Sequence, residues 1–475
     1  MITNILSRYR PRYVRSLVYM LQASEYKIGD YFAWLRRVKD FGAVEKRKQL
    51  TKSPKALFVL GLGWLLWLAI IACGVLVVFT TFTMYGYALG AIIVLASPFL
   101  LAYGIAALLL GVHLVQKPIG AAVISRARRS LARHTAVKIA VAGSFGKTSM
   151  REIIKAVLSE GKRVAAPPHS YNTPLGISAF VKTLKGDEEV LLFELGEYYP
   201  GDVRTLCNLV KPDIGVITGV NEAHLQKFKT LESTARTVFE LADFLGEKPV
   251  YVNGESELAR KNARAGHIVY DKNGAGEWIV ESPHTELSGT TFTLAKGSEK
   301  MSLKSSLLGL HQVGPLVAAA VIAKGMGLSS EQIKTGIART KPFDHRLEPK
   351  TDESGVITLN DSYNGNPDGV GAVIAFLASL KSRRFYVTPG LVEMGARAEA
   401  VHREIGRELA AAEIEKVVLI KNSVTPFIEQ GLKDGQYRGE VLWFDDALAA
   451  FAALPHMTVK GDIVLLQNDW PDQYA

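Results

Sequence analysis

The hydrophobic and polar positions of this 475-residue chain fall into three consecutive patterns. Residues 1–55 mix basic side chains with aromatic and aliphatic ones at roughly helical spacing, whereas residues 56–116 contain no Asp, Glu, Lys or Arg. From residue 137 onward, short β-branched runs alternate with helical stretches. The patterns predict amphipathic helices, then a membrane segment, and then an α/β protein with parallel sheets.

The uncharged segment is long enough for a hairpin of two transmembrane helices. Residues 56–79 and 87–115 are apolar runs, and a spanning helix needs roughly 20 apolar residues. Pro98 is expected to kink the second helix. Basic residues flank both runs, which predicts a multi-pass protein of the cell inner (plasma) membrane with both termini and the α/β part in the cytoplasm.

The excess positive charge of the chain lies around the membrane segment. Residues 1–138 hold 19 Lys and Arg against 4 Asp and Glu, so the remainder holds 37 against 42. We interpret residues 1–55 as helices along the inner surface, with basic side chains toward anionic lipid phosphates. An amphipathic pair packed on the soluble domain is the alternative. Because the soluble part is mildly acidic, nucleic acid is not an expected partner.

The stretch KIAVAGSFGKTSMREII, residues 138–154, has the pattern of a strand, a glycine turn and a helix start. Gly143 and Gly146 would let backbone N–H groups converge on phosphate at the helix N-terminus. Lys147 would supply charge to the terminal phosphates, and the Thr148 hydroxyl is placed to ligate Mg²⁺. Val141 occupies the position of the first glycine in the general phosphate-loop template, so a plain glycine-rich turn is the alternative.

The segment GSFGKTS resembles the shortened phosphate loop of the Mur ligases, which join an amino acid or dipeptide to a peptidoglycan precursor. Further segments look most like the D-alanyl-D-alanine-adding, MurF-type branch of this family. They follow one another in the right order: FELGEYYPGDVRTL, VKPDIGVITGVNEAHLQKF, LLGLH, DHRLE, NDSYNGNPDGV and GLVEMGARAEAVHREIG. The resemblance covers about residues 137 to 467.

The resemblance implies the fold class and the domain organisation. It implies an α/β fold with a P-loop-containing, ATP-binding Mur ligase central domain at residues 137–340 and a Rossmann-like C-terminal domain at residues 341–475. Before these domains we expect a basic amphipathic juxtamembrane region at 1–55, two transmembrane helices at 56–116 and a basic linker at 117–136.

The resemblance also implies the reaction of an ADP-forming acid–amino-acid ligase. In that reaction ATP phosphorylates a carboxylate, and an amine attacks the resulting acyl phosphate. A carboxylate is a poor electrophile, so ATP supplies the leaving group. Two anions must be held together, which requires Mg²⁺ and basic residues. ATP and Mg²⁺ are therefore the expected cofactors.

Site residues follow from the resemblance motif by motif. ATP binding is expected from Gly143, Ser144, Phe145, Gly146, Lys147, Thr148, Ser149, Arg346 and Asp361. Catalytic roles are expected for Lys147, His224 and Arg346, metal ligation for Thr148, Glu194 and His224, and substrate binding for Asn172, Asn364 and Asn366.

Several of these residues have structural alternatives. By residue type alone, Glu194 and His224 are more often structural than metal-binding. Arg346 would otherwise form a surface ion pair, and Asn364 and Asn366 would otherwise be turn formers.

Four positions depart from the family pattern. Val238 stands where the family usually has a lysine that becomes carbamylated and helps to hold a second Mg²⁺. Gln312 and Pro315 replace asparagines of the adenine region, and Gly219 replaces another asparagine. The number of metal ions and the base contacts are therefore open.

The largest departure is at the N-terminus, where a membrane segment takes the place of the family's UDP-binding domain. We expect a membrane-anchored, ATP-dependent amide-bond ligase of cell-wall peptidoglycan precursor synthesis, with a dipeptide such as D-Ala-D-Ala or an amino acid as the second substrate. A lipid-linked precursor or a poly-amino-acid polymer is an alternative acceptor. A catalytically lapsed, membrane-anchored ATP-binding scaffold is the alternative from another class. A transporter is disfavoured, because the two spans carry no charged residue to handle a polar cargo.

Overall fold

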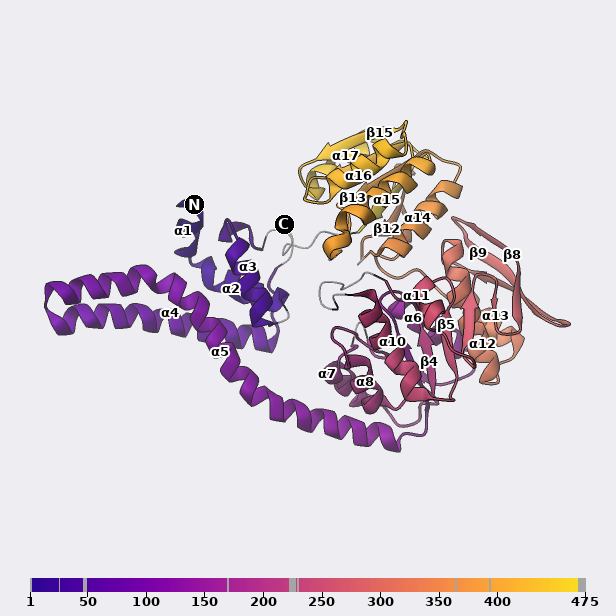
Figure 1. Cartoon of the computed structure of the whole chain (residues 1–475), viewed down its shortest axis with the longest axis horizontal. Helices are drawn as coiled ribbons and strands as arrows, with labels where there is room; N and C mark the ends of the chain where they lie inside the picture. Colours follow the sequence, from indigo (N-terminus) through magenta and orange to yellow (C-terminus); the bar gives the residue numbers. More distant parts are fainter. Residues whose placement is uncertain are drawn as a thin grey trace. The chain divides into compact units, whose positions relative to one another are not determined.

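The computed structural model describes residues 2–24, 26–45, 49–168, 171–221, 228, 230–363, 365–392 and 394–468. The chain forms two compact units, one within residues 1–122 and the other within residues 123–469. Each unit is described by itself below, and Figure 1 shows the elements of both.

The first unit is entirely helical where it is described. It contains α1 (Ile2–Arg8), α2 (Arg12–Ala23), α3 (Ile28–Arg37), the 3₁₀ helix η1 (Phe41–Ala43), α4 (Pro54–Thr81) and most of α5 (Met84–Arg133). Helices α4 and α5 lie antiparallel as a hairpin in Figure 1. The predicted helices of residues 1–55 and the predicted helix pair are thus present.

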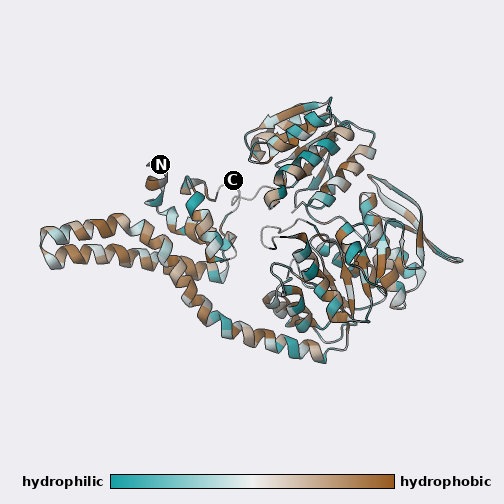
Figure 2. Ribbon diagram, in the orientation of Figure 1, coloured by the Kyte–Doolittle hydropathy of each residue, from teal (hydrophilic) through white to brown (hydrophobic). Residues whose placement is uncertain are grey.

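The hairpin is apolar over most of its surface. Both helices are long and apolar enough to cross a membrane by length and composition, and Figure 2 shows hydrophobic residues along both of them. Large apolar side chains point away from the protein, including Leu65, Leu76 and Phe79, which are 61–64% exposed. In a soluble protein many such side chains would be buried, so this exposed apolar surface is consistent with a membrane hairpin.

Helices α2 and α3 bury their apolar faces against the hairpin. A Cβ atom on Gly63 of α4 would lie 3.0 Å from Val14 of α2 and 3.2 Å from Ile105 of α5, so the three helices meet closely there. The Tyr31 hydroxyl of α3 donates a hydrogen bond to the Ala102 carbonyl, 2.9 Å away. These contacts give the first unit a core of its own.

Helix α5 is longer than the predicted span. It continues past both of its prolines to Arg133, so most of the segment 117–136, which was expected to be a linker, is helical. Ala127 and Leu131 near its end are buried in the core of the second unit. The last turns of α5 are therefore a structural part of that unit.

The second unit begins with a ten-stranded sheet in the order β10-β9-β8-β7-β6-β5-β4-β1-β3-β2. Strands β1 to β6 are parallel and β6 to β10 are antiparallel to their neighbours. The strands are β1 (Val137–Ala142), β2 (Val164–Ala165), β3 (Val190–Glu194), β4 (Ile214–Ile217), β5 (Val250–Asn253), β6 (Ile268–Asp271), β7 (Gly274–Ala275), β8 (Trp278–Glu286), β9 (Gly289–Lys296) and β10 (Glu299–Ser305).

Helices cover both faces of this sheet, because its central strands are apolar on both sides. Ile139 and Val141 of β1 face one helical layer, and Ala140 and Ala142 face the other. The first layer holds α6 (Lys147–Leu158), α12 (Val313–Gly325) and α13 (Ser330–Ala338); the second holds α7 (Pro174–Val181), α8 (Asp202–Val210), α10 (Leu231–Leu245) and α11 (Glu257–Asn262). The 3₁₀ helix η2 (Leu310–Gln312) precedes α12.

A second, six-stranded sheet follows in the order β11-β12-β16-β13-β14-β15, parallel except for β11. Apolar clusters on both of its faces join it to its helices, as in the first sheet. The elements are β11 (Glu348–Thr351), β12 (Ile357–Asp361), α14 (Pro367–Ser379), β13 (Arg384–Thr388), η3 (Gly395–Arg397), α15 (Ala398–Ala411), β14 (Lys416–Ile420), α16 (Thr425–Asp434), β15 (Glu440–Phe444), α17 (Ala447–Met457) and β16 (Ile463–Gln467). The predicted pair of doubly wound α/β domains is confirmed.

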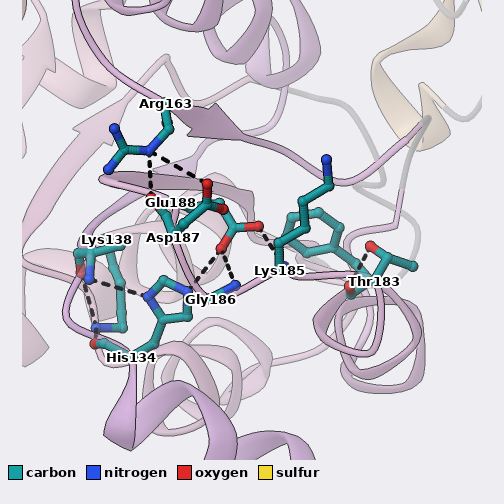
Figure 3. A network of polar contacts seen from close by, with 10 residues as sticks. His134, Lys138, Arg163, Thr183, Lys185, Gly186, Asp187 and Glu188 are labelled. Carbon is teal, nitrogen blue, oxygen red and sulfur yellow. Dashed lines mark hydrogen bonds and ion pairs between the residues drawn. The ribbon is translucent and has the colours of Figure 1, made fainter.

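Polar contacts fasten the end of α5 to the first sheet (Figure 3). Nε2 of His134 lies 3.1 Å from Oε2 of Glu188, and Nδ1 of His134 accepts the Ala136 N–H at 3.2 Å. The ring therefore donates to Glu188 from Nε2. Lys138 of β1 donates to the His134 carbonyl at 2.9 Å. Burial opposes the charge of Glu188, but backbone N–H groups, among them that of Lys185, and His134 lower its pKa to about 2.

We predict that Glu188→Gln destabilises the second unit in a pH-dependent way. The pKa of this carboxyl group is about 2 in the fold against 4.5 ordinarily. Its charge therefore stabilises the fold above pH 4.5, and that contribution is lost as the pH falls through 2. After allowance for solvent screening, we expect a loss of about 1–2 kcal/mol at pH 7. Thermal unfolding in detergent between pH 7 and pH 3 should show the difference from wild type shrinking, and an equal effect of Glu189→Gln at its exposed neighbour would contradict this.

Candidate active site

The predicted phosphate loop connects β1 to α6 through two glycines with positive φ. Gly143 has φ +143°, and a Cβ there would lie 2.2 Å from Oγ1 of Thr218 on the segment after β4. Gly146 has φ +71° and immediately precedes α6. The Ser144 N–H donates to the Gly219 carbonyl at 2.9 Å. The loop is thus held at the N-terminus of α6, where anions are bound by backbone N–H groups and the helix dipole.

Gly219 closes this loop from the neighbouring strand. It has φ +149°, and a Cβ there would lie 2.4 Å from the Phe145 ring. Any side chain would collide with Phe145, which explains why glycine stands where the family pattern has asparagine. The absence of a side chain at Gly219 leaves room for the Phe145 ring.

Two consecutive residues of α6 reach acidic partners. Nζ of Lys147 lies 2.8 Å from Oε1 of Glu197 and also donates to the Gly143 carbonyl. Oγ1 of Thr148 donates to Oε2 of Glu194 at 3.1 Å. Ser149 is the third residue of the same helical turn. The first turn of α6 thus presents an ammonium group and a hydroxyl group beside two carboxylates.

Glu194 is the last residue of β3 and is only 2% exposed. Its Oε1 lies 2.9 Å from Nη1 of Arg151, one turn further along α6. Burial raises the pKa of Glu194, and the charges of Arg151 and Lys147 oppose that shift. The nearby cations favour the ionised form of this buried carboxyl group, whose oxygen atoms are possible metal ligands at the edge of the phosphate loop.

The donor set fits Mg²⁺ chemistry. This ion prefers oxygen ligands and is usually held by one or two carboxylates together with phosphate oxygens and water. The Glu194 carboxylate and the Thr148 hydroxyl are such donors, and they lie within hydrogen-bond distance of each other. Among the described residues no three His, Cys, Asp or Glu side chains are grouped closely enough to hold a metal ion by themselves.

Glu197 was not singled out by the sequence analysis, although it lies in the matched segment FELGEYYPGDVRTL. It is 2% exposed and is paired with Lys147. An acidic residue in a loop after a strand gives no local signal of such a contact, because its partner is 50 residues away.

Arg346 lies in the turn between the two sheets, and its guanidinium group is 4.8 Å from the centre of the Tyr363 ring. Burial lowers the pKa of Arg346, whereas Asp361, Tyr363 and Glu194 act in the opposite direction. The guanidinium group is thus within electrostatic reach of the buried carboxylate of the first sheet. The role of Arg346 at the nucleotide site stays a prediction.

Asp361 ends β12 and is occupied by contacts within its own domain. Its carboxylate accepts the Leu347 N–H at 3.1 Å and the Gln467 side-chain amide at 2.7 Å. Burial raises its pKa, and the Gln467 hydrogen bond and Arg346 oppose the shift. These contacts place the Asp361 carboxylate next to the turn that carries Arg346.

The three asparagines predicted for substrate binding have different positions. The Asn366 side chain accepts the Gly369 N–H and so caps α14, and it also accepts the Asn221 side-chain amide at 2.7 Å. The backbone carbonyl of Asn172 accepts the Gly196 N–H at 3.0 Å, which places it beside the end of β3. Asn364 lies outside the described residues, and so does the predicted metal ligand His224.

The other departures from the family pattern have structural explanations in part. Val238 on α10 is fully buried in an apolar core, where an ionised lysine derivative would be costly. Nε2 of Gln312 lies 3.0 Å from Nε2 of His311, whose pKa is lowered to about 4 by burial, so the ring is a neutral acceptor. Pro315 lies in the first turn of α12, where a missing N–H costs no helical hydrogen bond.

Comparison with known proteins identifies both domains. The Mur ligase middle domain matches residues 141–323, and the Mur ligase, glutamate ligase domain matches residues 345–467. The chain is 27% identical over 362 residues to the UDP-N-acetylmuramoyl-tripeptide--D-alanyl-D-alanine ligase of Mycobacterium leprae (strain TN), over 69% of this chain and 70% of the relative. It is 30% identical to that of Mycobacterium tuberculosis (strain ATCC 25618 / H37Rv), of which it spans only 58%.

Solved structures agree with this fold. The MurF ligase from Thermotoga maritima in complex with ADP superposes with a TM-score of 0.66 at 23% identity, covering 74% of this chain and 80% of that one. MurF from Acinetobacter baumannii superposes with a TM-score of 0.65 at 19% identity, covering 74% and 77%. The two matched domains and the shared fold show that the chain belongs to the Mur ligase family.

Proposed function

We propose that this protein is a membrane-anchored, ATP-dependent amide-bond ligase of MurF type. The observation that carries the proposal is the grouping of Lys147 and Thr148 with the buried carboxylate of Glu194. This arrangement offers a cation and hard oxygen donors at a loop suited to phosphate. The relatives' names indicate the substrate class, a UDP-N-acetylmuramoyl-tripeptide and D-alanyl-D-alanine.

In the proposed reaction an oxygen of the acceptor carboxylate attacks the γ-phosphorus of ATP, the bond to the β-phosphate breaks and ADP leaves. The amine of the second substrate then attacks the acyl carbon, phosphate leaves, and the nitrogen loses a proton. Bound Mg²⁺ would neutralise phosphate charge and polarise the P–O bonds. Enclosing the reactants between two domains would exclude water, which would otherwise hydrolyse the acyl phosphate.

The chain's own residues would divide this work. Backbone N–H groups of residues 143–149 would bind the phosphates, and Lys147 would neutralise the transferred group. Thr148 and Glu194, with His224, would hold the cation. Arg346 would reach the γ-phosphate with its forked donors.

The C-terminal domain and the segment before α7 would complete the site. Asp361 is proposed to contact the nucleotide while it stays anchored by Gln467. Asn172, Asn364 and Asn366 are proposed to orient the acceptor peptide or the incoming amine. Asn366 would do so from the N-terminus of α14, where its side chain is fixed as a cap.

The apolar hairpin is proposed to anchor the ligase in the inner membrane, with the second unit in the cytoplasm. Its exposed apolar side chains and the surrounding basic residues support this placement. A lipid-linked acceptor would then be held near the site by confinement to the same surface.

Lys147→Ala should strongly slow phosphate transfer. Removing one charge-stabilising donor from a phosphoryl-transfer site lowers turnover by about 10²–10³-fold, so phosphate release with ATP, Mg²⁺ and both substrates should fall to that extent. Lys155→Ala, on the exposed face of the same helix, is the matched control and should keep wild-type turnover. If Lys147→Ala left cell growth unaffected in place of the wild-type gene, the protein would be an ATP-binding scaffold and the ligase proposal would be wrong.

Removal of residues 1–116 should affect the turnover of soluble and lipid-linked acceptors differently. The shortened chain keeps the last turns of α5, including the buried Leu131, so the second unit retains its core. Turnover of a UDP-linked acceptor should persist, while turnover of a lipid-linked acceptor in vesicles should fall by about tenfold or more as the effective concentration is lost. Equal losses on both acceptors, or a loss on neither, would contradict membrane anchoring as the role of the hairpin.

A further inference from the structure

Glu197 is a buried carboxylate whose contact competes with the proposed role of Lys147. It is 2% exposed, and its Oε1 lies 2.8 Å from Nζ of Lys147. The ammonium group has three donors, of which one goes to Glu197 and one to the Gly143 carbonyl. If the ammonium group moves onto the terminal phosphates of ATP, this ion pair weakens or breaks.

Once the ion pair is broken, negative charges repel one another at the phosphate loop. A triphosphate carries several negative charges, and Glu197 would then face it from a site that water hardly reaches. Like charges in such an environment repel strongly, and the buried carboxylate would have lost its ammonium partner. A cation bound together with the nucleotide would reduce this repulsion and would take the place of the ammonium group beside Glu197.

The geometry beside Glu197 suits a divalent cation. Glu197 and Glu194 are three residues apart and contact consecutive residues of α6, Lys147 and Thr148. The two carboxylates and the Thr148 hydroxyl thus lie along one turn of helix, at the end where phosphate would bind. Hard oxygen ligands of this kind, together with phosphate oxygens, are what Mg²⁺ prefers.

We propose that Glu197 exchanges partners during the reaction cycle. It pairs with Lys147 until that ammonium group moves onto the phosphates, and it then faces the divalent cation that accompanies ATP. The inference rests on the proposed function, since it requires ATP at this loop. Glu197 is in this view a positioning residue that couples cation binding to nucleotide binding.

The proposal predicts opposite effects of Glu197→Gln with and without the cation. In EDTA the variant should bind the non-hydrolysable analogue AMP-PNP about tenfold more tightly than wild type, because the repelling charge is gone and Lys147 is released. With Mg²⁺ present, the concentration of the ion that gives half-maximal AMP-PNP binding should rise about tenfold. Glu197→Asp, which keeps the charge, should restore the wild-type behaviour in EDTA.

Calorimetric titration of the full chain in detergent measures both quantities, in EDTA and over a series of Mg²⁺ concentrations. Glu188→Gln is the matched control, because it removes a partly buried, hydrogen-bonded carboxylate beyond the opposite end of β3. That control should leave the Mg²⁺ dependence unchanged.

The outcomes separate this inference from the function on which it rests. If Glu197→Gln weakened AMP-PNP binding by the same factor in both conditions, or changed neither, Glu197 would be only structural and the inference would be wrong. If the wild-type chain bound no AMP-PNP in either condition, the proposed ligase function would fail together with it.

Discussion

The parallel pairing of β1 with β3 and β4 is the constraint on which the candidate site depends. Parallel strands in register end at the same edge of a sheet. Here the ends of the three strands deliver the phosphate loop, Glu194 and Thr218 to one place. Thr218 and Gly219 fix the loop from one side and Glu194 approaches α6 from the other. A change in strand order would scatter these groups even if every motif were kept.

Much of this could be read from the sequence because it depends on local pattern. The strands are buried on both faces and appear as continuous apolar runs, and the loop shows its glycines and its lysine directly. Contacts between distant residues could not be read in this way. Lys147 and Glu197 are 50 residues apart, and Asp361 and Gln467 are 106 residues apart. The local sequence around these residues does not indicate that they pair. The continuation of α5 to Arg133 was also missed, because a basic stretch containing proline has the composition of a linker.

The departures from the family pattern become easier to understand when the neighbours are known. Gly219 is required by the Phe145 ring, and Val238 belongs to an apolar core that could not accept an ionised group. Two buried carboxylates, Glu194 and Glu197, flank the first turn of α6.

The side chain of Asn366 serves two domains with one oxygen atom. It accepts the Gly369 N–H within the C-terminal domain and the Asn221 amide from the central domain. Pulling the domains apart at this point would break the contacts of Asn221 with Asn366 and Asp368, whereas the helix cap is completed within the C-terminal domain. The N-terminal cap of α14 is therefore independent of the contact between the two domains.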